Sequence, residues 1–425
     1  MAVVPCPGRQ AAQPRRPLAP CEIAAPPVLP NAVVAIANMA PSRSSRVRPS
    51  EVAADTKRNF IPLVKKNYGE MFPPYSYLYR QPILQLAIQR QKPTTHPPHF
   101  LIEVGDPVMK ALTYAGGDTQ ASEAVGGPRV RIPFICAANE RRPGGDWETG
   151  CVGYEEKLCR RSNLSATLSS PWPNSQETSN YPIPSQGGIL SDSVVVCRGP
   201  HDRYDRLDSW FDLPVVSVPP TRWPKLKDNG TKYSFAEERD MTRDKLRGAL
   251  RICLYNGYDR VIIGDFGLGN GYRNPPQELA ELWRDVFLFD PDLRGQFAYV
   301  VFVFEDPLQS TTRHILDEIA KKEHGSKGKS RAGSSSSSGS SRSHSSAPTD
   351  RHIFEHVFNS AELSAFGRST NAGGRLEEDH MTQATGRQGS SASGLQGFYR
   401  REGKGAIREQ FGSNSGCGGR VSVGF

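Results

Sequence analysis

The sequence predicts an α/β fold of three layers, in which helices cover both faces of a mixed or largely parallel central sheet. Short apolar runs rich in β-branched residues are typical of buried strands, and segments with helical periodicity lie between several of them. Strands that alternate with helices favour such a covered sheet. The runs that predict strands are RVRIPFICAAN (129–139), DSVVVCR (192–198), LPVVSVPP (213–220), DRVIIGDFG (259–267) and AYVVFVFED (298–306).

The helices are expected on the basis of their periodicity and of signals at their ends. Ser50 can cap a first helix that continues to about Tyr68. Ser234, followed three residues later by Glu237, has the pattern of a capping box. Prolines at 275 and 276 suit the first turn of the last helix, where a missing N–H group costs least. The three helices expected between strands cover 151–168, 234–257 and 276–289.

Composition divides the chain into three parts. Residues 1–49 are rich in proline and arginine, and residues 326–425 are rich in serine and glycine. Such segments cannot bury a core, so both are predicted to be disordered, with one short helix in RHIFEHVFNSAEL (351–363). Between them, residues 50–325 form the predicted folded domain.

The basic charge of the chain belongs to its ends. Residues 1–66 contain ten Lys and Arg against three acids, and residues 321–425 contain fifteen against nine, whereas residues 67–320 are net negative. The tails allow weak nucleic-acid contact, although solvated disorder is the favoured interpretation of their charge.

Cysteine spacing and hydropathy favour a reducing compartment. No cysteine pair has the spacing of a zinc knuckle or a redox motif, and Cys136 and Cys253 lie in apolar runs where buried thiols are expected. No apolar stretch reaches the ~20 residues that span a bilayer, so no membrane contact is expected. The arginine-rich start resembles a transit peptide, but its prolines oppose the amphipathic helix that such a peptide needs. We expect a cytoplasmic or nuclear protein, with Met39 as an alternative start.

A first glycine-rich loop follows the strand that ends near Asn139. In RRPGGDWETG (141–150), glycines let backbone N–H groups approach a ligand, and the helix that follows offers unpaired donors. This combination suits a diphosphate, with a simple turn at Pro143-Gly144-Gly145 as the alternative.

Two adjacent acids, Glu155 and Glu156, lie in the first turns of the next helix. Neighbours on a helix are ~100° apart, so the two carboxylates do not face each other. Either both point toward a partly apolar pocket, or Glu156 forms an exposed pair with Arg160 that contributes ~0.3–0.5 kcal/mol.

A second glycine-rich loop, GDFGLGNGYRNPP (264–276), follows a strand and precedes a helix. Its four glycines leave backbone amides free to hold phosphate, with tight packing as the alternative reason for them. The loop lacks the surroundings of a kinase DFG motif, and Tyr272 stands where the dinucleotide-binding pattern requires a third glycine.

Together these motifs resemble the microbial-type poly(ADP-ribose) glycohydrolase catalytic domain, a macrodomain-like family, in its fungal-like form. The family has three glycines followed at a short interval by Gln-Glu-Glu. Here seven residues separate Gly144-Gly145-Asp146 from Tyr154-Glu155-Glu156. RRSNL (160–164) and QGGILSDSVVVCR (186–198) also resemble family segments, and the second loop resembles its GAWGCGAF segment.

The resemblance implies a macrodomain-like fold and an ADP-ribosyl glycohydrolase that cleaves an O-glycosidic bond of ADP-ribose. Glu156 would protonate the leaving oxygen and then activate water, and Glu155 would hold a ribose hydroxyl. Asn139 would bind the distal ribose, while Phe266 or Tyr272 would pack on the ligand. The implied site residues are Glu155 and Glu156 for catalysis and, for ligand binding, Asn139, Gly144, Gly145, Asp146, Tyr154, Gly264, Phe266, Gly267, Leu268, Gly269, Asn270, Gly271 and Tyr272.

Two departures from the family pattern leave a second function open. Asp146 replaces the third glycine, and its charge near a dianionic ligand could cost ~4 kcal/mol at a surface-like dielectric, unless it turns away, caps the following helix or meets Arg141 or Arg142. Tyr154 replaces glutamine. The alternatives are a non-catalytic ADP-ribose or nucleotide reader, or a scaffold that acts through its tails.

The expected ligand is ADP-ribose or an ADP-ribosylated protein. No metal or cofactor is implied, and a monomer is expected. A tension remains over the catalytic acid, because a helix N-terminus favours the anion whereas an acid catalyst needs a raised pKa.

Overall fold

Seven strands form one mixed sheet in the computed structural model, which describes residues 47–88, 97–327 and 347–363. In the order in which they lie in the sheet, the strands are β1 (Tyr77–Tyr79), β4 (Gly188–Arg198), β5 (Arg206–Val218), β3 (Phe134–Ala137), β8 (Arg260–Ile263), β9 (Tyr299–Phe304) and β2 (His99–Val104). β1, β4 and β5 pair antiparallel, and the pairs from β5 through to β2 are parallel. The predicted mixed sheet is confirmed, and all five predicted strands belong to it.

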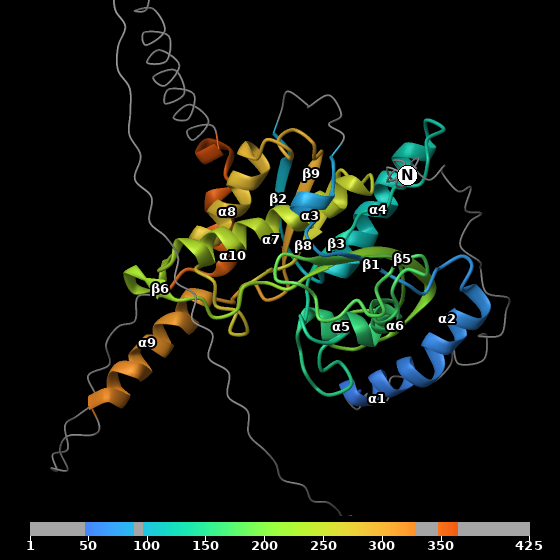
Figure 1. Cartoon of the computed structure of the whole chain (residues 1–425), viewed down its shortest axis with the longest axis horizontal. Helices are drawn as coiled ribbons and strands as arrows, with labels where there is room; N and C mark the ends of the chain where they lie inside the picture. The colour runs from blue at the N-terminus through green and yellow to red at the C-terminus, as the bar shows by residue number, and fades with distance from the viewer. Residues whose placement is uncertain (1–46, 89–96, 328–346, 364–425) are drawn as a thin grey trace, which may run out of the picture. The chain divides into compact units, whose positions relative to one another are not determined.

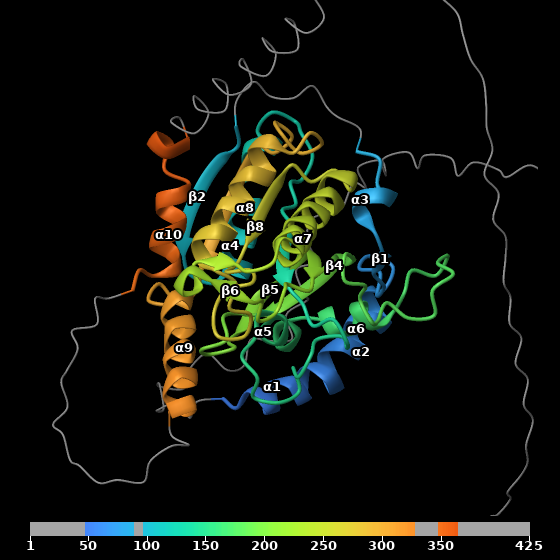
Figure 2. The same ribbon diagram turned by 60° about the vertical axis from the view of Figure 1, so that its left-hand side comes forward.

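Helices cover both faces of the sheet, as predicted for three layers (Figures 1 and 2). The period of two along each strand sends alternate side chains into two cores: Ile135 and Ala137 face one, whereas Phe134 and Cys136 face the other. On the first face lie α3 (Pro82–Gln85), α7 (Ala236–Tyr255), α8 (Pro276–Phe289) and α10 (Asp350–Val357). On the second face lie α1 (Pro49–Asp55), α4 (Pro107–Glu123), α5 (Tyr154–Arg161) and α6 (Leu164–Ser169).

The remaining elements join these layers at their margins. A small separate cluster, Phe60, Val64, Val195 and Cys197, packs the first helical segment on β4. The helices and strands not yet described are η1 (Thr56–Phe60), α2 (Ile61–Tyr68), the hairpin of β6 (Leu226–Lys227) and β7 (Lys232–Tyr233), the short helix η2 (Asp228–Gly230) between them, and α9 (Thr311–Lys327).

The register of β3 decides where the glycine loops lie. β3 pairs in parallel with β8, and Ile135 lies opposite Ile263, the last residue of β8. Because parallel neighbours end at the same edge of a sheet, the chain after Ala137 and the chain after Ile263 both leave from that edge. Ligands bind at this carboxyl edge in open α/β sheets.

Two predicted helix caps are wrong, although the helices themselves form. The first helix begins at Pro49 with Arg48 as its N-cap, so Ser50 lies inside it. The capping box at Ser234 does not form, because the Ser234 N–H group donates to Lys225 O and Phe235 becomes the N-cap. Backbone pairing with a distant segment therefore overrides the local capping signal.

Strand β2 and helix α4 lay outside the predicted elements, and α10 confirms the short helix expected after residue 350. Ile353 and Phe354 of α10 are buried in the first core although the predicted domain ends at 325. Residues 1–46, 328–346 and 364–425, on which the other expectations about the tails fall, lie outside the described residues. Within the described residues, no helix is both long and apolar enough to cross a membrane.

Candidate active site

Glu155 lies beneath the first glycine loop and ties it to the end of β3. Its side chain is buried, with 1% of its surface exposed. One carboxylate oxygen accepts from the Asn139 N–H group at 2.7 Å, and the other accepts from the Gly144 N–H group at 3.3 Å. Burial raises the pKa of Glu155 to about 8, the Asn139 N–H group opposes the rise and the Glu156 charge adds to it. Burial therefore favours the neutral, protonated form of Glu155.

Glu156 lies between two glycines that leave room for its carboxylate. A Cβ atom on Gly145 would overlap Glu156 Oε1, and one on Gly153 would overlap Oε2. The Asp146 N–H group donates to Oε1 at 3.5 Å, a long contact. Among the described residues Glu156 has no ion-pair partner, and its side chain is partly exposed. The carboxylate is thus unpaired and accessible.

The alternative of an exposed Glu156–Arg160 pair is wrong. Arg160 is fully buried, and its guanidinium donates to Trp147 O at 2.8 Å, to Thr149 O at 2.9 Å and to Cys151 O. These three carbonyls belong to the first loop, so Arg160 replaces the hydrogen bonds that the loop backbone would otherwise make with water.

The charge of Asp146, the main departure in this loop, is offset within the loop. Its half-exposed carboxylate forms an ion pair with Arg142, one of the outcomes foreseen for it. The Asn139 side chain accepts from the Arg141 N–H group at 2.9 Å and from the Arg142 N–H group at 3.2 Å. Its Nδ2 atom would lie 3.3 Å from a Cβ on Gly145, so Asn139 adjoins the Glu156 carboxylate.

The second loop combines buried side chains with backbone N–H groups that have no protein partner in the described part of the chain. Phe266 and Leu268 are buried in the first core, and the Phe266 ring packs edge-on against Trp283 at 6.0 Å. Within the described residues, the N–H groups of Gly267, Asn270 and Gly271 have no hydrogen-bond partner. Three backbone donors are therefore free, as a phosphate-binding loop requires.

Tyr154, at the start of α5, packs against the start of the second loop, and Tyr272 of that loop feels the charges of the acid pair. A Cβ on Gly264 would lie 3.7 Å from the Tyr154 ring, and burial followed by the neighbouring Asp265 raises the pKa of Tyr154. Burial raises the pKa of Tyr272 as well, and the charges of Glu155 and Glu156 add to it. Tyr272 therefore lies within electrostatic reach of both acids.

An aromatic and cationic rim that the sequence patterns did not indicate adjoins the second loop. Trp223 is 62% exposed; its backbone N–H donates to Tyr272 O at 2.7 Å, and its indole N–H donates to Asn270 O at 3.3 Å. The Arg222 guanidinium lies 5.7 Å from the Trp223 ring and 5.6 Å from the Tyr272 ring. No sequence spacing links 222–223 to 270–272, so only the fold could reveal this rim.

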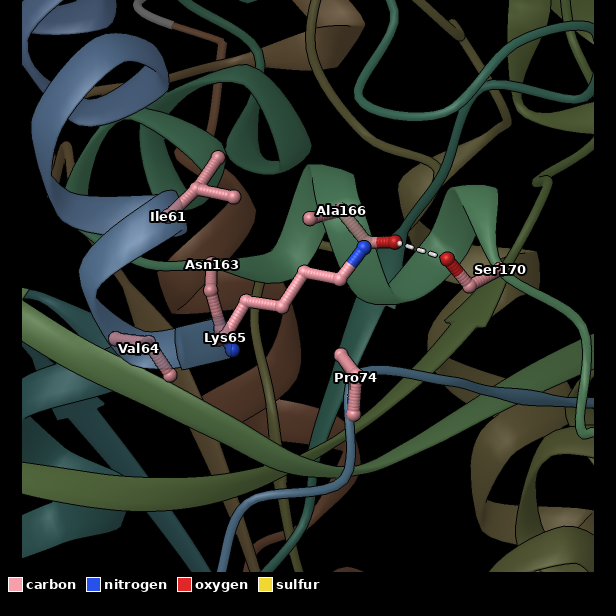
Figure 3. Close-up of a pocket in the computed structure, with 7 residues that line it drawn as sticks. All are labelled: Ile61, Val64, Lys65, Pro74, Asn163, Ala166 and Ser170. Atoms are coloured by element: carbon pink, nitrogen blue, oxygen red, sulfur yellow. Dashed lines mark hydrogen bonds between the residues drawn. The ribbon is translucent and has the colours of Figure 1, made fainter. Parts of the chain in front are cut away.

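Elsewhere the second face carries a hollow between α2 and α6 (Figure 3). It contains none of the predicted site residues, and its lining is Ile61, Val64, Lys65, Pro74, Asn163, Ala166 and Ser170. Within the described part of the chain, no group of three or more His, Cys, Asp or Glu side chains is placed to hold a metal ion.

Residues 106–199 match the family described as "Microbial-type PARG, catalytic domain", where PARG is poly(ADP-ribose) glycohydrolase. The predicted family resemblance is confirmed over these residues, which include the first loop and both glutamates. No curated protein matches the chain.

Among solved structures, the chain is similar to PARG from Thermomonospora curvata, with 19% identity and a TM-score of 0.45 over 64% of this chain and 98% of that one. It is also similar to PARG from Deinococcus radiodurans in complex with ADP-ribose, with 17% identity and a TM-score of 0.40 over 60% of this chain and 98% of that one.

Proposed function

We propose that this chain is an ADP-ribosyl glycohydrolase that cleaves an O-glycosidic bond of ADP-ribose, in a polymer or on a protein. The family match over residues 106–199 supports this function. The observation that carries it is the contrast within the acid pair: Glu155 is buried and bonded to backbone, whereas Glu156 is unpaired and accessible between two glycines.

Glu156 is the proposed catalytic residue. Cleavage at a ribose passes through an oxocarbenium-like state, which a nearby carboxylate stabilises. Glu156 would protonate the leaving oxygen and then take a proton from the attacking water. Burial raises the pKa of Glu155 and favours its neutral form, so the proton transfer is assigned to Glu156 because of its accessible position between two glycines.

Glu155 is better suited to positioning the loop than to holding a ribose hydroxyl, because both of its oxygens already accept from backbone N–H groups. We assign the distal ribose to Asn139, whose amide adjoins Glu156. Of the two candidate packing residues, Tyr272 is the better placed, since Phe266 is buried in the core.

The second loop is the proposed diphosphate site. Its three free N–H groups can each donate to a phosphate oxygen, and such donors are effective because they are fixed before the ligand binds. Arg222 adds a positive charge beside Tyr272. The folded domain would then extend from about 49 to 363, since α10 completes the core.

Substitution of Glu156 by Gln tests the function. Release of ADP-ribose from ADP-ribosylated protein should fall ~10²–10⁴-fold, the range for loss of a general acid–base group, while calorimetry should still detect ADP-ribose binding. Glu148→Gln is the matched control, because Glu148 lies in the loop just before α5 but forms an exposed ion pair with Lys57. Undiminished turnover in Glu156→Gln would refute the assignment.

A non-catalytic reader of ADP-ribose is the second candidate, favoured by Asp146 at the position of the third family glycine. The same two measurements on the unaltered chain separate the candidates. Binding accompanied by turnover supports the hydrolase, and binding without turnover supports the reader.

A further inference from the structure

We infer that Asp350, at the start of α10, is a positioning residue that holds the second glycine loop in its ligand-binding conformation through Thr311 and Gln309. This inference rests on the proposed function for its ligand, ADP-ribose. Asp350 follows the loop by about eighty positions and falls outside every motif considered above.

Asp350 is fully buried and receives three hydrogen bonds from one short segment. Its Oδ1 atom accepts from the Thr311 N–H group at 2.8 Å. Its Oδ2 atom accepts from the Thr311 hydroxyl at 2.6 Å and from the Gln309 amide at 3.0 Å. Burial raises the pKa of Asp350 to about 6, against the opposing effect of the Thr311 bonds, and the three donors around the carboxylate favour its ionised form. A buried carboxylate with three donors is fixed in place.

The Thr311 hydroxyl connects Asp350 to the loop. It donates its single proton to Asp350 and accepts from the Gly269 N–H group at 2.6 Å. Because an ionised carboxylate can only accept, Asp350 fixes the direction of the hydroxyl proton and leaves a lone pair for Gly269. Gly269 lies between the free N–H groups of Gly267 and Asn270, so this bond orients the donors on either side.

Gln309 supports the same turn from a second direction. Its amide nitrogen donates to Asp350 and, at 2.8 Å, to Asp265, which is the second residue of the loop. A Cβ on Gly269 would lie 3.1 Å from Gln309 Oε1, so the amide packs closely on the loop backbone. Two side chains of one segment thus hold both the start and the middle of the loop.

The anchor is itself held by backbone bonds and by the core. The Asp350 N–H group donates to Gln309 O at 2.8 Å, and the Ser310 hydroxyl donates to Pro348 O at 2.8 Å. Within α10, the Phe354 ring lies 5.1 Å from Phe302 of β9. The helix that carries Asp350 therefore cannot shift without disturbing the core (Figure 2).

The test compares Thr311→Val and Thr311→Ser in the full chain. Valine keeps the shape of threonine but leaves the Gly269 N–H group without a partner, whereas serine keeps the hydroxyl. Loss of such a bond should raise the Kd and the KM for ADP-ribose substrates about tenfold in Thr311→Val, with a much smaller change in kcat because Glu156 is untouched. Thr311→Ser should bind almost as tightly as the unaltered chain, and Asp350→Asn should weaken binding in the same direction as Thr311→Val.

Thr167→Val is the matched control, because Thr167 is also buried and its hydroxyl donates to Leu164 O in α6. It should lower the Tm without changing the Kd. Amide hydrogen exchange provides a readout that needs no ligand: exchange of the Gly269 N–H group should be faster in Thr311→Val than in Thr311→Ser.

Unchanged exchange and an unchanged Kd in Thr311→Val would overturn the inference, as would equal weakening in Thr167→Val. Failure of the proposed function gives a different result, since the unaltered chain would then neither bind nor hydrolyse ADP-ribose while exchange would still report on the anchor. If Asp350→Asn does not fold, the Thr311 pair decides the question.

Discussion

The two glycine loops leave adjacent parallel strands at the same edge of the sheet, yet their backbone N–H groups have different partners. In the first loop, the N–H groups of Gly144 and Asp146 donate to Glu155 and Glu156. In the second loop, the N–H groups of Gly267, Asn270 and Gly271 have no partner within the described residues. The first loop thus uses its donors on the protein's own carboxylates, whereas the second leaves three donors without a partner within the described residues.

The two loops are also held by different forces. Arg160 holds the first loop through three backbone carbonyls. Two apolar side chains, Phe266 and Leu268, and the neutral Thr311 hydroxyl hold the second. Glycine content alone therefore does not assign a ligand to a loop. The assignment depends on which charged groups the fold brings to each set of N–H groups.

Of the substitutions that distinguish the two loops, Gly145→Ala should have the largest effect on activity. Its Cβ would overlap the Glu156 carboxylate, and Gly145 has a φ of 54°, which side chains rarely adopt. Displacement of the catalytic carboxyl should lower kcat about 100-fold or more, while the Kd for ADP-ribose changes only a few-fold because the second loop is intact. Steady-state kinetics and calorimetry measure both. Gly150→Ala is the control, since a Cβ there meets nothing within 4 Å; equal losses in both variants would contradict the prediction.

Arg160→Met tests how the first loop is held. Three carbonyls would lose their donor in a buried setting, so the free energy of unfolding should fall by about 3 kcal/mol. Urea denaturation measures this loss. Arg142→Gln, which removes an exposed ion pair with Asp146, should cost less than about 1 kcal/mol. A loss no larger in Arg160→Met than in Arg142→Gln would show that the buried guanidinium does not stabilise the loop.

Glu155→Gln tests the protonation state of the acid pair. The pKa of Glu155 is raised from 4.5 to about 8 in the folded protein, so the folded state binds the proton more tightly than the unfolded state. Its contribution to stability is fully present below pH 4.5 and is lost as the pH rises toward 8. Glutamine does not titrate, so Glu155→Gln should remove this decline with pH; its NH2 group would face a backbone N–H group, which lowers stability by the same amount at every pH.

The decline expected for the unaltered chain up to pH 8.5 is on the order of 1–4 kcal/mol, given ~1.4 kcal/mol per pKa unit. Denaturation series between pH 4.5 and 8.5 for both proteins measure it. If the free energy of unfolding changes with pH in the same way in both proteins, Glu155 does not titrate in this range.

The smallest expected effect concerns the rim of the second loop. Arg222→Gln removes a cation beside Tyr272, which should raise the Kd for ADP-ribose about 2–5-fold at low salt, because an exposed charge contributes ~1 kcal/mol or less and is screened. Calorimetry at two ionic strengths should show the difference shrink as salt is added. If the loss of ADP-ribose affinity does not depend on salt, Arg222 acts by packing and not by its charge.

Local patterns predicted most elements because their signals lie within a few residues. Helix α8 matches its predicted range of 276–289, and the five predicted strands all form. The cap at Ser234 was wrong because Lys225, a residue outside that local pattern, binds its N–H group. The sequence indicated Glu155 and Glu156 as a pair. It could not show that Glu155 is buried and Glu156 partly exposed, because burial depends on segments that are distant in the chain.

The sequence by itself determined that two glycine loops follow two buried strands and that an acid pair begins the helix after the first loop. Those features depend on turn chemistry and side-chain periodicity, which act over short distances along the chain. Only the tertiary structure decided which acid is buried, that Arg160 turns inward rather than pairing with Glu156, and that Asp350 reaches Gly269 through Thr311. Burial and hydrogen-bond partners depend on packing between segments far apart in the sequence, and that packing set the roles of these residues.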